Sequence, residues 1–423
     1  MKRPTSPDDS RLTSPYHPAM ERQSASRGYE IAVLIILSLV NGVVALDRLA
    51  VNFLSPFIVA DLGLSNTQLG LLSSALSGAI SVSGLLIAAV ADRSGRQKAV
   101  LVWMLVAFSL MSGGAGIAAG FAALFVARLL LGVTEGPLVP IAQAIMGAVS
   151  APRRRGFNMG TMQIGGAFLI GAMAGPVVIV QVAEMIGWRH TFFGTMLPGL
   201  VIAALVALFV RQPRPPVPVA AVEGAITQLP SIRELLRSRN LLLSMAIAAL
   251  FTAWLTVQNV FLPRYLTETI GHSPQTMSWL LSLAGFGGLI GGIAIPALSD
   301  RFGRRRLTIV TGFASVLVPL ALLIVPGSVG LLGISLVIGS LVVGCAPLVC
   351  AIIPSESVAP GRVATAVALS MCAAELVGGV LSPPLAGWAA DSFGLRSVFW
   401  LDIALALACG ALALALTETR KRS

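Results

Sequence analysis

Charged residues are scarce in this 423-residue sequence, at 11% of the chain against 56% hydrophobic residues. A soluble domain usually carries roughly 25% charged residues. So few charges cannot cover the surface of a water-soluble protein of this size, and the apolar segments must therefore face lipid. The composition predicts an all-α polytopic membrane protein.

Residues that build several kinds of catalytic or metal site are also few. The four cysteines lie in apolar runs without a CxxC spacing, so neither a disulfide nor a metal site is indicated. The three histidines fall outside the predicted spans, which excludes a buried histidine relay. The glycine-rich pieces follow no strand and match neither a phosphate loop nor a dinucleotide fingerprint. We therefore expect no enzyme, no ATP-driven pump and no cofactor.

The charge that is present has an uneven distribution. Of the 29 Lys and Arg residues, 24 fall in the two tails and in alternate predicted loops. Three fall in the opposite loops and two inside predicted helices; these are Arg189, Arg264, Arg396, Arg48 and Arg128. This asymmetry predicts cytoplasmic termini and a basic side that faces anionic lipid rather than nucleic acid. With 26 arginines among the basic residues, the composition suggests a GC-rich bacterium and hence its inner membrane.

Twelve apolar runs are long enough to span a bilayer, which takes about 20 mostly apolar residues. They are predicted at 30–56, 67–90, 98–118, 121–148, 157–181, 191–210, 241–263, 275–298, 307–326, 329–352, 363–388 and 397–416. One long polar interruption divides them into two sets of six. The expected organisation is a disordered cytoplasmic tail at 1–28, a six-helix half at 29–210, a cytoplasmic linker at 211–240, a second half at 241–416 and a tail at 417–423.

The two halves repeat one another. The segment Asp92–Arg96 (DRSGR) recurs as Asp300–Arg304 (DRFGR), 208 positions later, and Glu184–Arg189 recurs as Asp391–Arg396 at an offset of 207. Transporters built from parallel repeats bind their substrate where the halves meet, near mid-membrane. The repeat therefore predicts a substrate site at that boundary.

These features resemble the major facilitator superfamily over about 30–416. The loop at 88–98 (AAVADRSGRQK) is similar to the family's signature loop, apart from Ala88 in place of its usual first glycine, and the loop at 300–304 is similar to the second copy. Gly171–Pro176 is similar to the family's glycine–proline helix. The resemblance implies twelve helices in two pseudo-symmetric halves.

At a finer level, Asp47-Arg48 and the run from Arg128 to Glu135 resemble the anion:cation symporter branch, whose members carry sugar acids and other carboxylates. The branch implies that Arg48 and Arg128 bind the anion and that Asp47 and Glu135 take part in proton coupling. Spinster-like transporters share much of this constellation, so the resemblance speaks for mechanism more than for substrate.

The chemistry of these charges leads to the same roles. Each charge within a span costs roughly 2.5–3.5 kcal/mol, so it should face the bundle interior. Arg128 and Glu135 lie roughly 10 and 20 Å from the outer end of their predicted helix, at about 1.5 Å per residue, and share one face. A guanidinium can grip a carboxylate with two hydrogen bonds. We hypothesise that protonation of Glu135 releases an arginine for the substrate; a purely structural ion pair is the alternative.

Other polar residues in the spans have weaker patterns. Glu375 is predicted either to join the coupling site or to form a buried pair, and Asp402 is expected at the membrane interface near the outer end of its helix. Four more residues are candidates to line the substrate site or simply to bond between helices. These are Gln163, Trp254, Gln258 and Asn259.

The repeated loops are predicted to gate the carrier. Helix N-termini favour a carboxylate, so the aspartates of these loops can bind helix ends of the opposite half when the inside is closed. The gating residues are Asp92, Arg93, Gly95 and Arg96, with Asp300, Arg301, Gly303 and Arg304. Positive-inside topology alone would explain the arginines but not the aspartates and glycines.

Together these patterns predict a secondary carrier, expected to be a monomer in membrane lipid, that uses the proton gradient to move a small organic anion by alternating access. A sugar acid or an aromatic acid follows from the branch resemblance. One alternative is a proton-driven exporter of lysolipids or drugs, which resembles the Spinster-like proteins. A more distant alternative is a non-transporting sensor.

Overall fold

The computed structural model describes residues 26–212, 235 and 237–419, and none of these residues forms a strand. Twelve helical segments among them are long and apolar enough to cross a membrane, which confirms the twelve predicted spans. The largest differences lie at the ends of the fifth, seventh and eleventh spans, which continue to Ile186, Thr269 and Phe393. Most of the predicted tails and linker lies outside the described residues.

The N-terminal half contains six spans and one short extra helix. Their elements are α1 (Arg27–Phe53), α2 (Ser55–Leu62), α3 (Asn66–Ser94), α4 (Gln97–Gly114) with η1 (Ala115–Ile117), α5 (Phe121–Glu135) with α6 (Leu138–Val149), α7 (Arg155–Gly166) with η2 (Ala167–Ala174) and α8 (Gly175–Ile186), and α9 (Trp188–Phe209).

The C-terminal half repeats this arrangement. Its elements are α11 (Arg239–Arg264) with η3 (Tyr265–Thr269), α12 (Pro274–Phe302), α13 (Arg304–Ala314) with α14 (Leu317–Ile324), α15 (Val329–Ser340) with η4 (Leu341–Gly344), α16 (Cys345–Pro347), η5 (Leu348–Ile352) and α17 (Ile353–Glu356), η6 (Pro360–Arg362), α18 (Val363–Ala373) with η7 (Ala374–Leu381) and α19 (Ser382–Phe393), and α20 (Arg396–Leu414).

Local sequence signals mark where several spans begin. Ser26, Ser238 and Ser273 cap α1, α11 and α12, and each side chain accepts a hydrogen bond from a backbone N–H of the first turn. A serine oxygen satisfies a backbone donor that would otherwise lack a partner. Gly187 and Gly303 adopt φ of +84° and +98° between consecutive spans, a conformation that glycine reaches without strain. The chain can therefore turn back within one or two residues.

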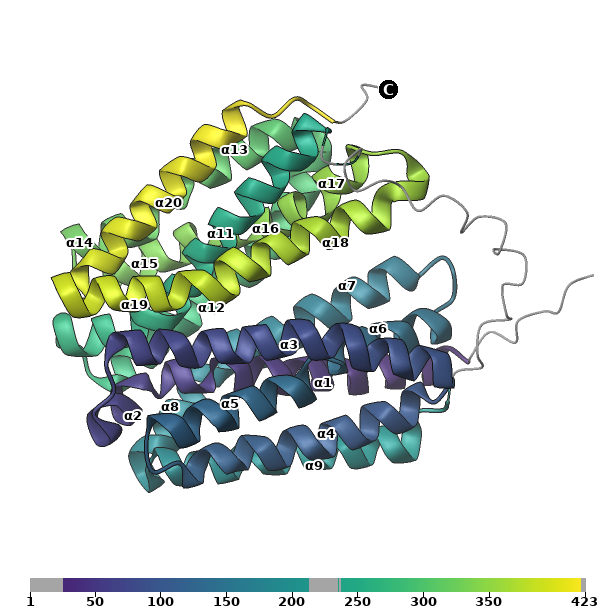
Figure 1. The fold of residues 1–423 in the computed structure, drawn as a ribbon, viewed down its shortest axis with the longest axis horizontal. Coiled ribbons are helices and arrows are strands. Elements are labelled where there is room, and N and C mark those ends of the chain that lie inside the picture. Colours follow the sequence, from purple (N-terminus) through teal and green to yellow (C-terminus); the bar gives the residue numbers. More distant parts are fainter. Residues whose placement is uncertain (1–25, 213–234, 236, 420–423) are drawn as a thin grey trace, which may run out of the picture.

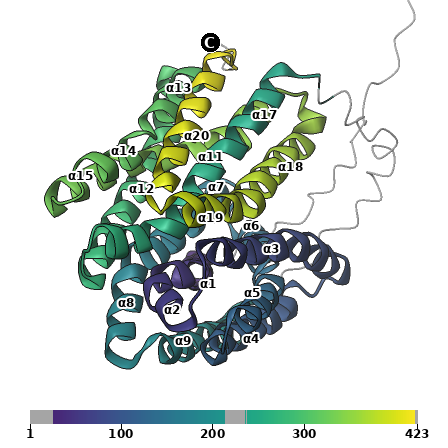
Figure 2. The same ribbon diagram turned by 60° about the vertical axis from the view of Figure 1, so that its left-hand side comes forward.

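The two halves meet along two equivalent seams. In one, α3 packs against α19 and η7; in the other, α12 packs against α8 and η2. Figures 1 and 2 both show α3 and α19 side by side along the boundary. Ser74 Oγ donates to Val380 O at 2.6 Å across the first seam, and Ser282 Oγ donates to Met173 O at 2.6 Å across the second. The sequence repeat thus reappears as a paired set of contacts.

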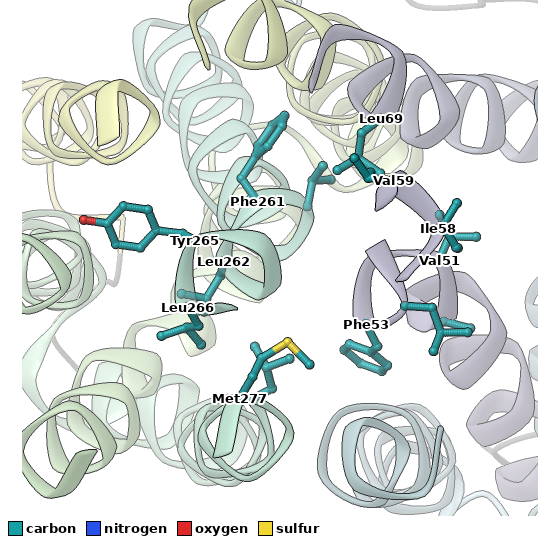
Figure 3. Close-up of a cluster of buried hydrophobic side chains, with 14 of the residues drawn as sticks. Val51, Phe53, Ile58, Val59, Leu69, Phe261, Leu262, Tyr265, Leu266 and Met277 are labelled. Atoms are coloured by element: carbon teal, nitrogen blue, oxygen red, sulfur yellow. The ribbon is translucent and has the colours of Figure 1, made fainter. Parts of the chain in front are cut away.

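The two ends of the molecule differ. We call the end that holds Ser26, Gln212, Arg239 and Thr419 the tail side, and the opposite end the far side. At the far side, Val51 and Phe53 of α1 belong to the same buried cluster as Phe261 and Met277 of the other half (Figure 3). Toward the tail side, the ribbons of α6 and α7 diverge from those of α17 and α18 (Figure 1). The halves are therefore packed together at the far side.

Candidate functional site

Asp47 and Arg48 are neighbours on α1, so their side chains leave the helix about 100° apart. Asp47 is buried inside the N-terminal half, where its Oδ1 accepts a hydrogen bond from Ser112 of α4. The Ser112 hydroxyl in turn lies 2.8 Å from Thr195 Oγ1 of α9. The Arg48 side chain remains 44% exposed. The carboxylate of Asp47 therefore points into the N-terminal half, and the guanidinium of Arg48 points out of it.

Arg48 forms an ion pair with Glu135 in the interior of the bundle. Its Nε donates to Glu135 Oε1 at 2.8 Å, and its Nη2 lies 2.6 Å from the same oxygen. Glu135 is the last residue of α5, next to the break at Gly136-Pro137, and its side chain is fully enclosed. Of the ion pairs among the described residues, this is the one that lies away from the ends of the membrane spans. It is the centre of the candidate site.

Arg128 lies deeper than Arg48. Its Nη1 donates to the backbone oxygen of Asp47 at 3.5 Å, and it interacts electrostatically with the carboxylates of Asp47 and Glu135. With only 2% of its surface exposed, it is enclosed within the N-terminal half. In this conformation Arg48 is accessible from outside the N-terminal half and Arg128 is not.

Glu375 brings a charge from the opposite half to this site. It interacts electrostatically with Arg48, and its position in η7 puts it on the α3 seam. A Cβ added at Gly379 would come within 2.5 Å of Glu375 Oε2 and 3.2 Å of Ser77 of α3, which locates the carboxylate near α3. The exposed guanidinium of Arg48 therefore faces the boundary between the halves.

The site has unused hydrogen-bonding capacity. Asp47 Oδ2, Glu135 Oε2 and Arg128 Nε are all buried and have no hydrogen-bond partner among the described residues. Buried polar atoms usually have a partner, so such orphans need an explanation. Here a carboxylate oxygen can take up a proton, and a guanidinium can turn to an anion. The arrangement is chemically suited to an exchange of partners.

The four remaining candidate residues differ in how far they are buried. Trp254 is 1% exposed, and its ring packs 5.5 Å from that of Phe251 inside the C-terminal half. Gln258 is buried, while Gln163 and Asn259 are exposed. The structure thus brings Glu375 to Arg48, whereas Trp254 lies in packed interior.

Asp402, which we expected at the membrane interface, lies six residues after the first residue of α20 and is enclosed in the protein interior. The residue has 0% of its surface exposed. Counting residues from the end of α20 gives the depth of Asp402 along the helix. The direction of its side chain depends on how α20 packs, and α20 packs mainly against α11 and α13. Both carboxylate oxygens lack a partner among the described residues.

Among the described residues, the contacts of the repeated loops lie within their own halves. Arg304 pairs with Asp300 at 2.6 Å and with Glu356 at 3.1 Å, both in its own half, while Arg301 lies over the ring of Phe302. In the first copy, Gly95 takes φ +62° and its oxygen accepts from Gln212 at 2.6 Å. Arg93 and Arg96 are exposed, and the side chain of Asp92 lies outside the described part of the structure.

Sequence reasoning missed a far-side contact made by Asp391 of α19. Its carboxylate accepts four hydrogen bonds from the start of α3: from Asn66 N at 2.8 Å, Asn66 Nδ2 at 2.9 Å, Thr67 N at 2.9 Å and Thr67 Oγ1 at 2.6 Å. Arg264, predicted in a loop, instead ends α11 and donates to Asn66 Oδ1. A side chain of one half thus caps a helix of the other.

Comparison with known proteins identifies the family to which this fold belongs. Residues 37–259 and 255–423 match the family model described as Major Facilitator Superfamily. Among curated proteins, the hexuronate transporter of Bacillus subtilis is 31% identical over 278 residues, which cover 64% of either chain. The sialic acid transporter NanX of Escherichia coli is 28% identical over 269 residues, 62% of this chain and 64% of that one. These matches span a little under two thirds of the relatives' own length.

Among solved structures, a bacterial homolog of the human lysosomal transporter Spinster superposes with a TM-score of 0.76. The match covers 92% of this chain and 97% of that one, at 19% identity. This likeness concerns the fold.

Proposed function

This chain belongs to the Major Facilitator Superfamily of membrane transporters, and from that premise we propose that it couples proton movement to the transport of a small organic anion. The observation that carries the proposal is the Arg48–Glu135 pair. One partner is fully enclosed, and the other is 44% exposed at the boundary of the halves.

The proposed exchange begins at Glu135. A proton taken up by Glu135 removes the negative charge that holds Arg48, because a neutral acid attracts a guanidinium far less than a carboxylate does. Arg48 can then bind a substrate carboxylate with two parallel hydrogen bonds. When the proton leaves, Glu135 competes again for Arg48 and favours release of the anion. Binding of the two ligands is thus linked through one guanidinium.

Asp47, Arg128 and Glu375 have supporting roles in this proposal. Arg128 interacts with both Asp47 and Glu135, so a change of charge on either alters the field at the other. Asp47 is the candidate for resetting the empty carrier. Glu375 lies at the boundary between the halves, so a motion of the C-terminal half would change its electrostatic interaction with Arg48. Gln163, Gln258 and Asn259 remain candidates to contact the rest of the substrate.

Alternating access is the proposed way in which the site changes sides. Support comes from the far-side packing of Figure 3 and from the Asp391 cap, which together join the halves at one end. Rocking about the two serine-bonded seams would open that end and close the other. We assign the tail side to the cytoplasm because exposed arginines of the described loops at 93–96, 153–155 and 305–306 gather there.

The proposed cargo is a carboxylate such as a sugar acid. The two curated relatives are named for hexuronate and sialic acid, both of which carry a carboxylate. An exposed arginine beside the boundary suits such a group. The cytoplasmic membrane of a bacterium, a monomeric state and a proton-driven cycle complete the proposal.

Uptake into proteoliposomes tests it. With an inward proton gradient, vesicles that hold the protein should accumulate labelled glucuronate or sialic acid, and a protonophore should abolish the accumulation. A panel of neutral sugars serves as the negative set. Accumulation of neutral sugars, or none of any carboxylate, would contradict the assignment of an anion.

The rival proposal is a proton-driven exporter of lysolipids or drugs. It predicts no carboxylate accumulation and instead proton-driven loss of a fluorescent lysolipid from the membrane. Running both substrates in the same vesicle preparation separates the two proposals.

A further inference from the structure

We propose that Asp402 is a further proton-binding group of this transporter, set in the C-terminal half apart from the Arg48–Glu135 pair and facing the indole of Trp254. The inference rests on the proposed proton coupling and adds a site to it. It starts from the burial of Asp402, which has 0% of its surface exposed and two carboxylate oxygens without a partner among the described residues.

Among the residues that the structure describes, no fixed positive charge lies beside Asp402. The helices packed against α20 are α11, α13, α14 and α19. The other ionisable residues of these helices and of α20 lie at helix ends or toward the tail side. They are Arg239, Arg264, Arg304, Arg305, Arg306, Asp391, Arg396 and Cys409. Tyr265 follows directly after the end of α11. An isolated carboxylate in an apolar interior is so costly that such a group is found neutral instead. In this conformation Asp402 therefore holds its proton.

Trp254 lies at the same depth on the neighbouring helix. Cys409 of α20 donates to the backbone oxygen of Ile247 in α11 at 3.8 Å, which fixes the register of these two antiparallel helices. Asp402 lies seven residues before Cys409, and Trp254 seven residues after Ile247, so both are about 10 Å from that contact in the same direction. Trp254 Nε1 is itself buried without a partner.

The two side chains also share a face. Ala406 and Cys409 pack in one buried cluster with Trp254, and Asp402 precedes Ala406 by one helical turn. An indole N–H is a donor only, and the carbonyl oxygen of a neutral carboxyl is an acceptor. A small side-chain rotation would satisfy two orphaned groups with one hydrogen bond.

The repeat indicates that the fold does not require an acid at this position. At the offset of 207 that relates Glu184 to Asp391, the counterpart of Asp402 is Thr195. Thr195 is neutral and serves as a hydrogen-bonding group beside Ser112 and Asp47. An acid in a span costs roughly 2.5–3.5 kcal/mol on insertion scales, and ionisable residues there mark proton and ion pathways. We therefore assign Asp402 to proton binding rather than to packing.

Infrared spectroscopy of the protein in bilayers tests the protonation. The carboxyl band of a neutral acid should be present in the wild type at neutral pH and lost in Asp402→Asn, which preserves size and shape. Asp61→Asn is the matched control, because Asp61 is an exposed aspartate that pairs with Arg189. An Asp402→Asn spectrum that keeps the full band would overturn the proposal. Trp254→Phe should move the band to higher frequency, and an unmoved band would overturn the pairing.

The proton count tests the role in coupling. In proteoliposomes the number of protons that accompany each carboxylate should fall by one in Asp402→Asn, with transport still measurable. If the wild type moves protons and Asp402→Asn moves the same number per carboxylate, Asp402 takes no part in the coupling. If the wild type moves no protons at all, the proposed function fails, while the infrared result still decides whether Asp402 binds one.

Discussion

At the scale of single residues, one dipeptide organises the site. Asp47 and Arg48 are adjacent, yet the first is bonded inside the N-terminal half and the second is exposed at its boundary. Helical geometry alone separates them by about 100°. The half therefore presents one exposed cation to the other half while a buried network holds the carboxylate behind it.

Arg48→Lys tests whether the guanidinium itself binds the anion. Lysine retains the charge but cannot form two parallel hydrogen bonds with a carboxylate. A hydrogen bond to a charged group is worth about 1.5–3 kcal/mol, so we expect carboxylate affinity to fall by about 10- to 150-fold. Calorimetric titration with glucuronate measures it. Arg154→Lys is the control, since Arg154 pairs with Glu30 at a helix end; equal losses in both variants would contradict a specific role for Arg48.

Sequence patterns were sufficient for part of this residue-scale description. Arg48, Arg128 and Glu135 stand out because charges are rare in apolar runs. Ser112 and Thr195 do not, because hydroxyls are common in spans and only packing shows which one meets Asp47. The depth of Asp402 could be counted along its helix, but its buried face could not.

At the scale of helices, the two seams join the halves in equivalent ways. Each has a serine of one half bonded to a carbonyl in a π-helical segment of the other. The cap at the far side breaks this symmetry. Asp391 binds the start of α3, whereas its counterpart Glu184 is exposed at the end of α8.

Asp391→Asn should weaken the far-side closure. The variant removes the charge from four hydrogen bonds, and a loss of about 1.5–3 kcal/mol corresponds to about a 10- to 150-fold shift from closed to open. The measurement is labelling of Ser74→Cys by an impermeant thiol reagent, with the four native cysteines replaced by alanine, because Ser74 lies buried in the seam.

Glu184→Gln gives the matched comparison for that experiment. It neutralises the equivalent position of the other half, and labelling of Ser74→Cys should stay at the wild-type rate. If Asp391→Asn labels no faster than Glu184→Gln, the cap does not hold the far side closed.

The helices themselves followed from the sequence, but their partners did not. Each span has about 20 apolar residues, and serines or glycines mark several of the ends, so boundaries could be read locally. The Asp391 cap joins residues 325 positions apart. No local pattern names the partner of such a contact, although the repeat had already singled out the position of Asp391.

At the scale of the whole molecule, the site sits where both halves can act on it. Arg48 and Glu135 come from the first half, and Glu375, which interacts with Arg48, comes from the second half at the α3 seam. A motion of one half against the other therefore changes the surroundings of the Arg48 guanidinium. In the proposed cycle of alternating access, such a motion would link the chemistry of this ion pair to the direction in which the carrier opens.

Glu135→Gln, assayed in proteoliposomes with labelled glucuronate, tests the exchange of partners most directly. Glutamine cannot ionise, so Arg48 stays free for the anion whatever the pH. The account predicts that exchange of glucuronate between equal pools continues within about threefold of the wild-type rate, whereas accumulation driven by a proton gradient is lost. Proton-driven accumulation that survives in Glu135→Gln would contradict the account.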